Sequence, residues 1–357
     1  MAVSALFVLA ASVSVPQAAE RPVPEFRTGT RLIRLDVSVV NGRGQPVPDL
    51  RPEDFEVRED GRPVAVTYFE ALRGDVVRPE DGSAAVAPAR RILLLVDAGA
   101  MSMGQLRRAR ESVAGYLRQA NAGEWLRLAN LSTGEVWDGE MPEDRERLLS
   151  AARGLWWQPS PWARGDADVP PIAERVESAP EGGEPSSAAT SGQFLSDFAQ
   201  TVGLLGTLEA LLTELEGVDG RKALVLVSPG FPQLGGLDRR LERVATLARQ
   251  AATAVYFVDA VGQDGLVPDG RWRPAHEMAW ERSGGAQDLA VATGGFTSRF
   301  ANSLLPALSR VAEEMRTYYV LGYAPPGRDD GRFRSVSVKV KVRGLSARTK
   351  KGYLALR

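Results

Sequence analysis

Three short runs of apolar residues, each followed by a helical pattern, place the strongest constraint on the fold of this chain. The runs lie at residues 91–96 (RILLLV), 222–228 (KALVLVS) and 253–259 (TAVYFVD). Uninterrupted apolar residues are typical of strands that are buried on both faces. Helical periodicity lies between and after them, at residues 103–120, 143–153, 194–216, 237–250, 285–292 and 302–316. This alternation predicts an α/β fold with a doubly wound, mainly parallel sheet.

The two ends of the chain carry a different pattern, in which apolar and polar residues alternate. Residues 31–40 and 54–59 alternate near the N-terminus, and residues 333–343 alternate near the C-terminus. Such alternation is typical of strands with one packed and one wet face. We therefore predict a small β-sandwich built from residues 28–72 with 317–357. An α/β domain at 91–316 would be inserted into it after a linker at 73–90.

Basic residues lie on alternating strand positions near the C-terminus. One explanation is that these residues lie on a sheet face exposed to solvent. The alternative is that they bind an anionic partner in the cell envelope. They are Lys339, Lys341, Arg343, Arg348, Lys350 and Lys351.

The first residues of the chain are apolar and uncharged. The stretch MAVSALFVLAASVSV is followed by Pro16 and by the small residues Ala18 and Ala19. It is shorter than the roughly 20 residues that a spanning helix needs. We interpret residues 1–19 as a secretory signal segment, which predicts an exported protein in the periplasm, on the envelope or outside the cell, with no transmembrane domain in the mature chain.

Composition excludes several classes of function. The chain of 357 residues has no cysteine and one histidine, so thiol nucleophiles, thiolate metal sites and sites with two histidines cannot be built. Its formal net charge of −1 gives no global basic field for nucleic acid. A hydrolase is a remote alternative, because its catalysis would depend on His276. We expect this histidine in an irregular loop (RWRPAHE).

Several segments resemble the von Willebrand factor type A domain. RILLLVDAGAMS resembles its first strand and metal-site loop, GRKALVLVSPG its fourth strand, and LAVATGGFTSR its fifth helix and sixth strand. The flanks TRLIRLDVSVVNGRGQPVPDLRPEDFEVREDG and RTYYVLGYAPPGRDDGRFRSVSVKVKVRGLSARTKKGYLA resemble the ends of an acidobacterial family that contains this domain. The resemblance implies non-catalytic binding of protein ligands. It also implies a metal-ion-dependent adhesion site, in which Mg²⁺ bridges to a ligand carboxylate.

The residues that this resemblance assigns to the metal site are eroded. Asp97 is kept, but Gly99 and Met101 stand where the family has serines, and Pro229 replaces an aspartate after Ser228. Magnesium needs close to six oxygen ligands, which glycine, methionine and proline side chains do not supply. We therefore expect no cofactor, and read Asp97 as a capping acid. If a metal binds, its ligands would be Asp97, a displaced Ser102 and a threonine, for which the candidates are Thr190, Thr201 and Thr207.

A long connector at 154–193 holds Trp156, Trp157 and Trp162. We expect a loop there, on the face where open α/β sheets bind ligands. The tryptophans form either an exposed anchor for a partner or a small satellite core. The leading hypothesis is an exported, non-enzymatic binding module for a protein or envelope ligand, independent of metal. Its face would be built from the Asp97 loop, the connector and the Ser228–Pro229 loop. An envelope scaffold without a discrete site and a metal-dependent adhesion module are the alternatives.

Overall fold

The computed structural model describes residues 32–73, 90–156, 187–218, 220–262 and 272–355. Residues from Leu32 onward form one compact unit. The predicted signal segment at 1–19, most of the predicted linker, and Trp157 and Trp162 lie outside the described residues.

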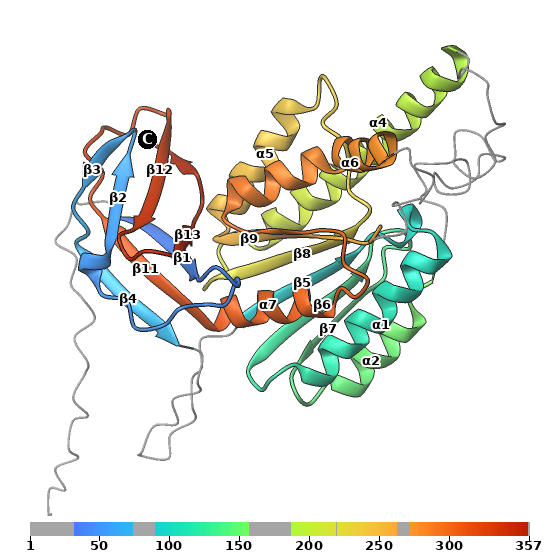
Figure 1. Cartoon of the computed structure of the whole chain (residues 1–357), viewed down its shortest axis with the longest axis horizontal. Coiled ribbons are helices and arrows are strands. Elements are labelled where there is room, and N and C mark those ends of the chain that lie inside the picture. The colour runs from blue at the N-terminus through green and yellow to red at the C-terminus, as the bar shows by residue number, and fades with distance from the viewer. Residues whose placement is uncertain (1–31, 74–89, 157–186, 219, 263–271, 356–357) are drawn as a thin grey trace, which may run out of the picture. The chain divides into compact units, whose positions relative to one another are not determined.

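A six-stranded sheet forms the centre of the α/β part (Figure 1). Its strand order is β10-β9-β8-β5-β6-β7, with β7 antiparallel to β6 and the other neighbours parallel. The three apolar runs become its central strands, buried almost throughout as their composition predicts. The strands are β5 (Arg90–Val96), β6 (Glu124–Asn130), β7 (Val136–Glu140), β8 (Lys222–Ser228), β9 (Thr253–Asp259) and β10 (Thr297–Ser298).

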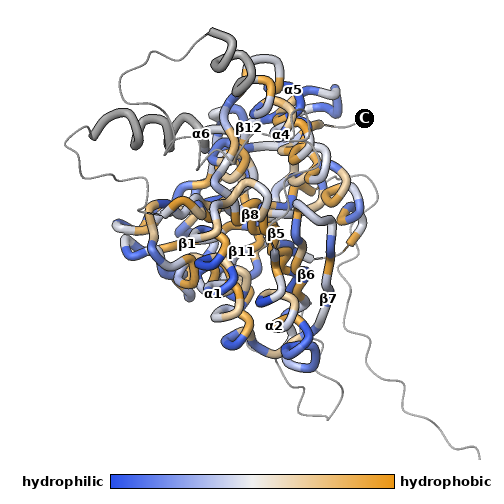
Figure 2. The backbone as a smooth tube through the Cα atoms, turned by 90° about the vertical axis from the view of Figure 1, so that its right-hand side faces the viewer, coloured by the Kyte–Doolittle hydropathy of each residue, from blue (hydrophilic) through white to orange (hydrophobic). Residues whose placement is uncertain are grey.

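Helices cover both faces of this sheet (Figure 1). On one face, Ile92 and Leu94 of β5 pack into a core with α1 (Met103–Gln119), α2 (Arg145–Gly154) and α7 (Leu305–Arg316). On the other face, Leu93 and Leu95 pack with α4 (Ser187–Glu214), α5 (Asp238–Gln250) and α6 (Trp272–Thr293). Figure 2 shows the hydrophobic colouring concentrated along the strands of this sheet. The fold is therefore a doubly wound α/β arrangement, as predicted at this level.

Strands from the two ends of the chain pair with each other, so blue and red strands lie side by side in Figure 1. One antiparallel sheet has the order β13-β1-β11-β4, and the other has the order β14-β12-β2-β3. Their inward residues share one core, which includes Leu35, Phe55, Tyr319 and Val336. The strands are β1 (Ile33–Val40), β2 (Phe55–Glu59), β3 (Arg62–Val64), β4 (Tyr68–Arg73), β11 (Thr317–Tyr323), β12 (Phe333–Val340), β13 (Ser346–Arg348) and β14 (Gly352–Leu354). This pairing confirms that strands of residues 31–69 associate with strands of residues 318–355.

Two loop expectations are wrong. Helix α4 begins at Ser187, so the connector at 154–193 is helical over its last residues. Once the packed part of a helix has formed, each residue added to its end gains one backbone hydrogen bond. The small residues of this stretch therefore lengthen the helix towards its N-terminus. Helix α6 begins at Trp272, so His276 lies in a helix rather than an irregular loop. Its Pro274 falls in the first turn, where a missing backbone N–H costs nothing.

The basic C-terminal residues do not all lie on a solvated face. Arg348 pairs with the carboxylate of Glu314 on α7, and its guanidinium lies over the ring of Phe296. Lys341 donates to the carbonyl of Glu53. Within the part of the chain that the structure describes, no helix is both long and apolar enough to span a membrane.

Candidate functional site

The carboxyl ends of β5 and β8 define the candidate site. The chain leaves β5 towards β6 on one side, whereas β8 lies on the other side of β5. In open α/β sheets such a reversal of strand order opens a crevice at the carboxyl ends, where ligands bind. Asp97 directly follows β5 and Ser228 ends β8, so the sequence places one carboxylate and one hydroxyl at this point.

A hydrogen bond joins these two residues across the sheet. The Ser228 hydroxyl donates to Oδ2 of Asp97 at 2.8 Å, and the same hydroxyl accepts from the backbone N–H of Gly230 at 3.0 Å. Burial raises the pKa of Asp97, and the hydrogen bond from Ser228 opposes part of that rise. The expected capping role of Asp97 is wrong, because its side chain makes no cap hydrogen bond to the short 3-10 helix Ala98–Ala100. Its carboxylate instead ties the two central strands together.

The backbone after Ser228 has little freedom. Gly230 has a φ of +96°, and a Cβ there would lie 2.8 Å from the Cβ of Ser283 on α6. Only glycine adopts such a conformation without strain. Pro229, which stands where the resemblance expects an aspartate, is partly exposed between Ser228 and Gly230. This loop therefore presents a pyrrolidine ring at the edge of the sheet, directly after the serine that binds Asp97.

The residues of the loop after Asp97 have structural roles. Gly99 lies in the 3-10 helix, and Met101 is fully buried in the core beneath α1. Ser102 is the N-cap of α1, where its hydroxyl accepts from the N–H of Gln105 at 3.3 Å and the Gln105 side chain accepts from the N–H of Ser102. This reciprocal arrangement is a capping box. The Ser102 oxygen is thus engaged in starting the helix.

We tested whether the remaining oxygen atoms fit a divalent cation. Thr201 lies in the interior of α4, not before a helix, and its hydroxyl donates to the carbonyl of Asp197 at 2.7 Å. Thr207 donates in the same way to Gly203. The described residues contain no group of three or more Asp, Glu, His or Cys side chains that could hold a metal ion. With Asp97 bonded to Ser228 and Ser102 capping α1, this set does not fit the oxygen cage that Mg²⁺ needs.

Sequence reasoning missed a second polar pair at the same edge. Asn130 ends β6 and is fully buried; its amide oxygen accepts from the backbone N–H and the hydroxyl of Ser132, the latter at 2.8 Å. Its amide nitrogen donates to the carbonyl of Trp156 at 3.2 Å. An asparagine that ends an apolar strand is the signal that could have found it. Through this contact Asn130 fixes the start of the connector at the carboxyl edge of the sheet.

Apolar side chains are exposed around this edge. Trp156 is 51% exposed, and Met103, the first residue of α1, is 65% exposed. Val136, which pairs with Ala129 near the end of β6, is 49% exposed. Leu195, in the first half of α4, is 65% exposed. These four, which we call the edge patch, are half of the eight large apolar residues that are exposed in the described segments. The others are Tyr68, Val291, Phe333 and Val342.

The remaining predicted site residues are less informative. Trp157 and Trp162 lie outside the described residues, so Trp156 alone is placed, and it is about half exposed. His276 lies near the start of α6. The geometry therefore brings together Asp97, Ser228 and Pro229 as expected, with Trp156 held to the same edge by Asn130.

Comparison with known proteins adds no family assignment. No protein-family model matches the chain, and a search of curated proteins finds no match.

Proposed function

We propose that this chain is a non-catalytic binding module related to von Willebrand factor type A domains, and that it binds a protein ligand through the carboxyl edge of its parallel sheet. The observation that carries the proposal is the strand-order reversal at the joined Asp97 and Ser228, because open α/β sheets bind ligands at such a point. The four exposed apolar residues of the edge patch come from elements that begin or end on this side of the sheet. Aromatic and methionine side chains are enriched at protein interfaces.

We further propose that this binding needs no metal ion. The side chains that would supply oxygen ligands are either replaced or engaged, as Met101 is in the core and Ser102 caps α1. The Asp97 carboxylate has Ser228 as its partner instead of a cation. A partner would therefore be held by apolar contacts and by direct hydrogen bonds to the edge.

The direct contact between Ser228 and Asp97 is better suited to a binding role than to an enzymatic one. The hydroxyl of Ser228 donates to a carboxylate directly, with no imidazole between them. A catalytic serine needs a general base that removes its proton and is itself oriented by a third group. A buried carboxylate that accepts a hydroxyl hydrogen bond is instead suited to hold the loop in one conformation.

A capture experiment tests the proposal. The full chain is immobilised and used to capture proteins from envelope extract of its source cells, with Mg²⁺ or with a chelator. A triple variant of the edge patch (Met103→Gln, Trp156→Ala, Leu195→Gln) is compared with a matched variant elsewhere (Tyr68→Ala, Val291→Gln, Val342→Gln). We expect capture to be lost only in the edge variant and to be unchanged by chelator.

Other outcomes discriminate among the alternatives. Equal capture by wild type and edge variant would contradict the proposed face and favour a scaffold without a discrete site. Loss of capture in chelator would favour a metal-dependent adhesion module. The export of the protein, which we also propose from its first 19 residues, is tested by N-terminal sequencing of the protein recovered from cell fractions.

A further inference from the structure

Three arginines, which we call the arginine cluster, lie at the carboxyl edge of the parallel sheet: Arg107, Arg110 and Arg153. Arg107 and Arg110 lie near the start of α1, which follows β5. Arg153 lies in the last turn of α2. This helix ends at the same edge, because Asn130 at the end of β6 donates to the carbonyl of Trp156. The cluster therefore lies on the side of the sheet where we propose that a ligand binds.

The packing of α1 against α2 brings the members of the cluster together. Arg145, the first residue of α2, donates to the carbonyl of Ala120, the residue after α1, at 2.8 Å. The helices therefore run antiparallel, side by side on one face of the sheet (Figure 1). At 1.5 Å per residue, Arg153 lies about 12 Å along α2 from this contact, and Arg110 lies about 15 Å back along α1. The two arginines are thus about level with each other.

The cluster is interleaved with apolar side chains of the edge patch. Arg107 and Arg110 follow Met103 by four and seven residues, so the three share one face of α1. Trp156 follows Arg153 by three residues. Met103, Trp156, Arg107 and Arg153 are all exposed. This part of the edge therefore offers cationic and apolar groups side by side.

The neighbours of the cluster along each helix do not balance its charge. Arg107 and Arg110 are three residues apart on α1, and like charges at this spacing destabilise a helix. Glu111 follows Arg107 by four residues and offsets one of these two charges. No acidic residue lies three or four positions from Arg110 or from Arg153. The cluster therefore has a surplus of positive charge.

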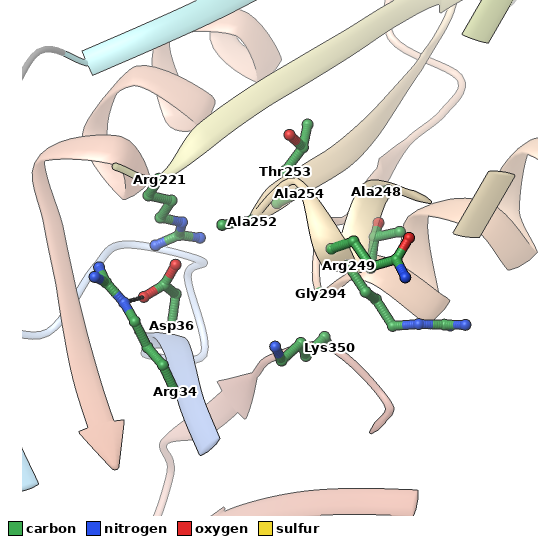
Figure 3. Close-up of a pocket in the computed structure, with 12 residues that line it drawn as sticks. Arg34, Asp36, Arg221, Ala248, Arg249, Ala252, Thr253, Ala254, Gly294 and Lys350 are labelled. Carbon is green, nitrogen blue, oxygen red and sulfur yellow. Dashed lines mark hydrogen bonds and ion pairs between the residues drawn. The ribbon is translucent and has the colours of Figure 1, made fainter. Parts of the chain in front are cut away.

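Contacts in space do not supply the missing carboxylates either. Within the described residues, no carboxylate forms an ion pair with any member of the cluster. The buried Nε of Arg110 also has no hydrogen-bond partner there. A paired arginine is seen in the cavity where β9 begins, in which Arg34 binds Asp36 at 3.1 Å (Figure 3). A ligand with carboxylates would give the cluster similar partners.

We propose that the protein ligand of the carboxyl edge presents an acidic segment, whose carboxylates pair with the arginine cluster while its apolar side chains contact the edge patch. This inference rests on the proposed function and names the chemistry of its ligand. Arginine, methionine and tryptophan are enriched at protein interfaces, and a guanidinium binds a carboxylate through two parallel hydrogen bonds. Sites for anionic lipids typically hold roughly four to eight basic residues, so a cluster of this size favours a protein over a membrane.

A peptide array tests the proposal on the full chain. Labelled protein is applied to short peptides of random sequence, and the peptide that binds most strongly is then titrated in solution by fluorescence anisotropy. We expect the bound peptides to be enriched in Asp and Glu together with apolar residues. Their affinity should fall as salt rises, because exposed ion pairs are screened. Absence of binding, or bound peptides without an excess of acidic residues, would overturn the proposal.

Two matched variants locate the contact. Arg107→Gln with Arg153→Gln removes two exposed charges of the cluster, whereas Arg43→Gln with Arg343→Gln removes two exposed charges at the turns after β1 and β12. Because exposed ion pairs are individually weak, we expect the acidic peptide to bind about fivefold more weakly to the cluster variant. The control should stay within about twofold of the wild type. Equal affinity of the two variants would contradict the proposal. Circular dichroism confirms that both are folded.

Capture from envelope extract separates this inference from the proposed function. If capture is lost in the edge-patch variant but unchanged in the cluster variant, the binding face stands and the acidic ligand is contradicted. If neither variant changes capture, the binding face is contradicted, together with the inference that rests on it. Sedimentation of the protein with phosphatidylglycerol vesicles should be absent. Sedimentation that is lost in the cluster variant would identify a membrane as the ligand and overturn the proposal.

Discussion

Replacing Ser228 by alanine provides a sharp test of the site geometry. The substitution removes the hydroxyl that donates to Asp97 and accepts from Gly230. Ser228 is fully buried, so water does not take the place of the lost group without rearrangement. Asp97 then keeps its place at the end of β5 but loses the bond that joins it to β8.

The magnitude follows from the charge of the acceptor. A hydrogen bond to an ionised group contributes about 1.5–3 kcal/mol, and a neutral pair contributes about 1 kcal/mol. We therefore expect Ser228→Ala to lower the free energy of unfolding by about 2–3 kcal/mol at pH values where Asp97 is ionised in the folded state. Where Asp97 is protonated, the loss should shrink towards about 1 kcal/mol.

The sign of the pH dependence follows from the pKa of Asp97, which burial raises and Ser228 lowers. The folded state holds the Asp97 proton more tightly than the unfolded state does. Its contribution to stability is therefore full below the unfolded pKa and is lost as pH rises through the folded pKa. Without Ser228 the folded pKa rises further, so the variant loses more stability at neutral than at acidic pH.

Urea unfolding followed by tryptophan fluorescence measures this difference at two pH values, one below and one above the folded pKa of Asp97 as found by titration. Ser132→Ala is the matched control, because that buried hydroxyl donates to the neutral amide oxygen of Asn130 at the same edge. It should cost about 1 kcal/mol at both pH values. An equal loss for Ser228→Ala at both pH values would refute the reasoning. So would a full loss in an Asp97→Asn background, where the acceptor carries no charge.

Three further outcomes are expected. Gly230→Ala should lower the free energy of unfolding by more than about 1 kcal/mol in urea titrations, since its φ of +96° and its contact with Ser283 both exclude a Cβ; an unchanged midpoint would contradict this. Glu124→Gln should cost about 3–5 kcal/mol, because this fully buried carboxylate accepts from Arg316 at 2.9 Å and its loss leaves a poorly compensated cation. Millimolar Mg²⁺ should not raise the melting temperature in differential scanning fluorimetry, whereas a saturable rise that disappears in Asp97→Ala would show a metal site.

The sequence is sufficient to predict the strands and their pairing, because the burial of each face of a strand restricts the residue types found there. A strand covered on both faces, such as β8, must be apolar throughout, and a strand with one face in solvent, such as β12, must alternate. Helix lengths were harder. Residues 187–193 and 272–284 contain glycine, serine, proline and arginine, which are poor in local signal, and their helical state follows from extension of packed helices.

The site was predictable in its residues but not in its contacts. Asp97 and Ser228 were singled out by the resemblance of their segments to the type A domain, but their hydrogen bond depends on β5 and β8 being neighbours. Asn130 also ends an apolar strand, but the resemblance gave it no role and it was missed.

Hydrogen exchange on the complex with a captured partner tests the central claim most directly. The account predicts new protection, in chelator, over the loops after β5 and β8, the turn after β6 and the residues around Trp156, with no change on β2 and β12. Protection confined to the strands at the chain ends, or protection at the Asp97 edge that requires Mg²⁺, would contradict it.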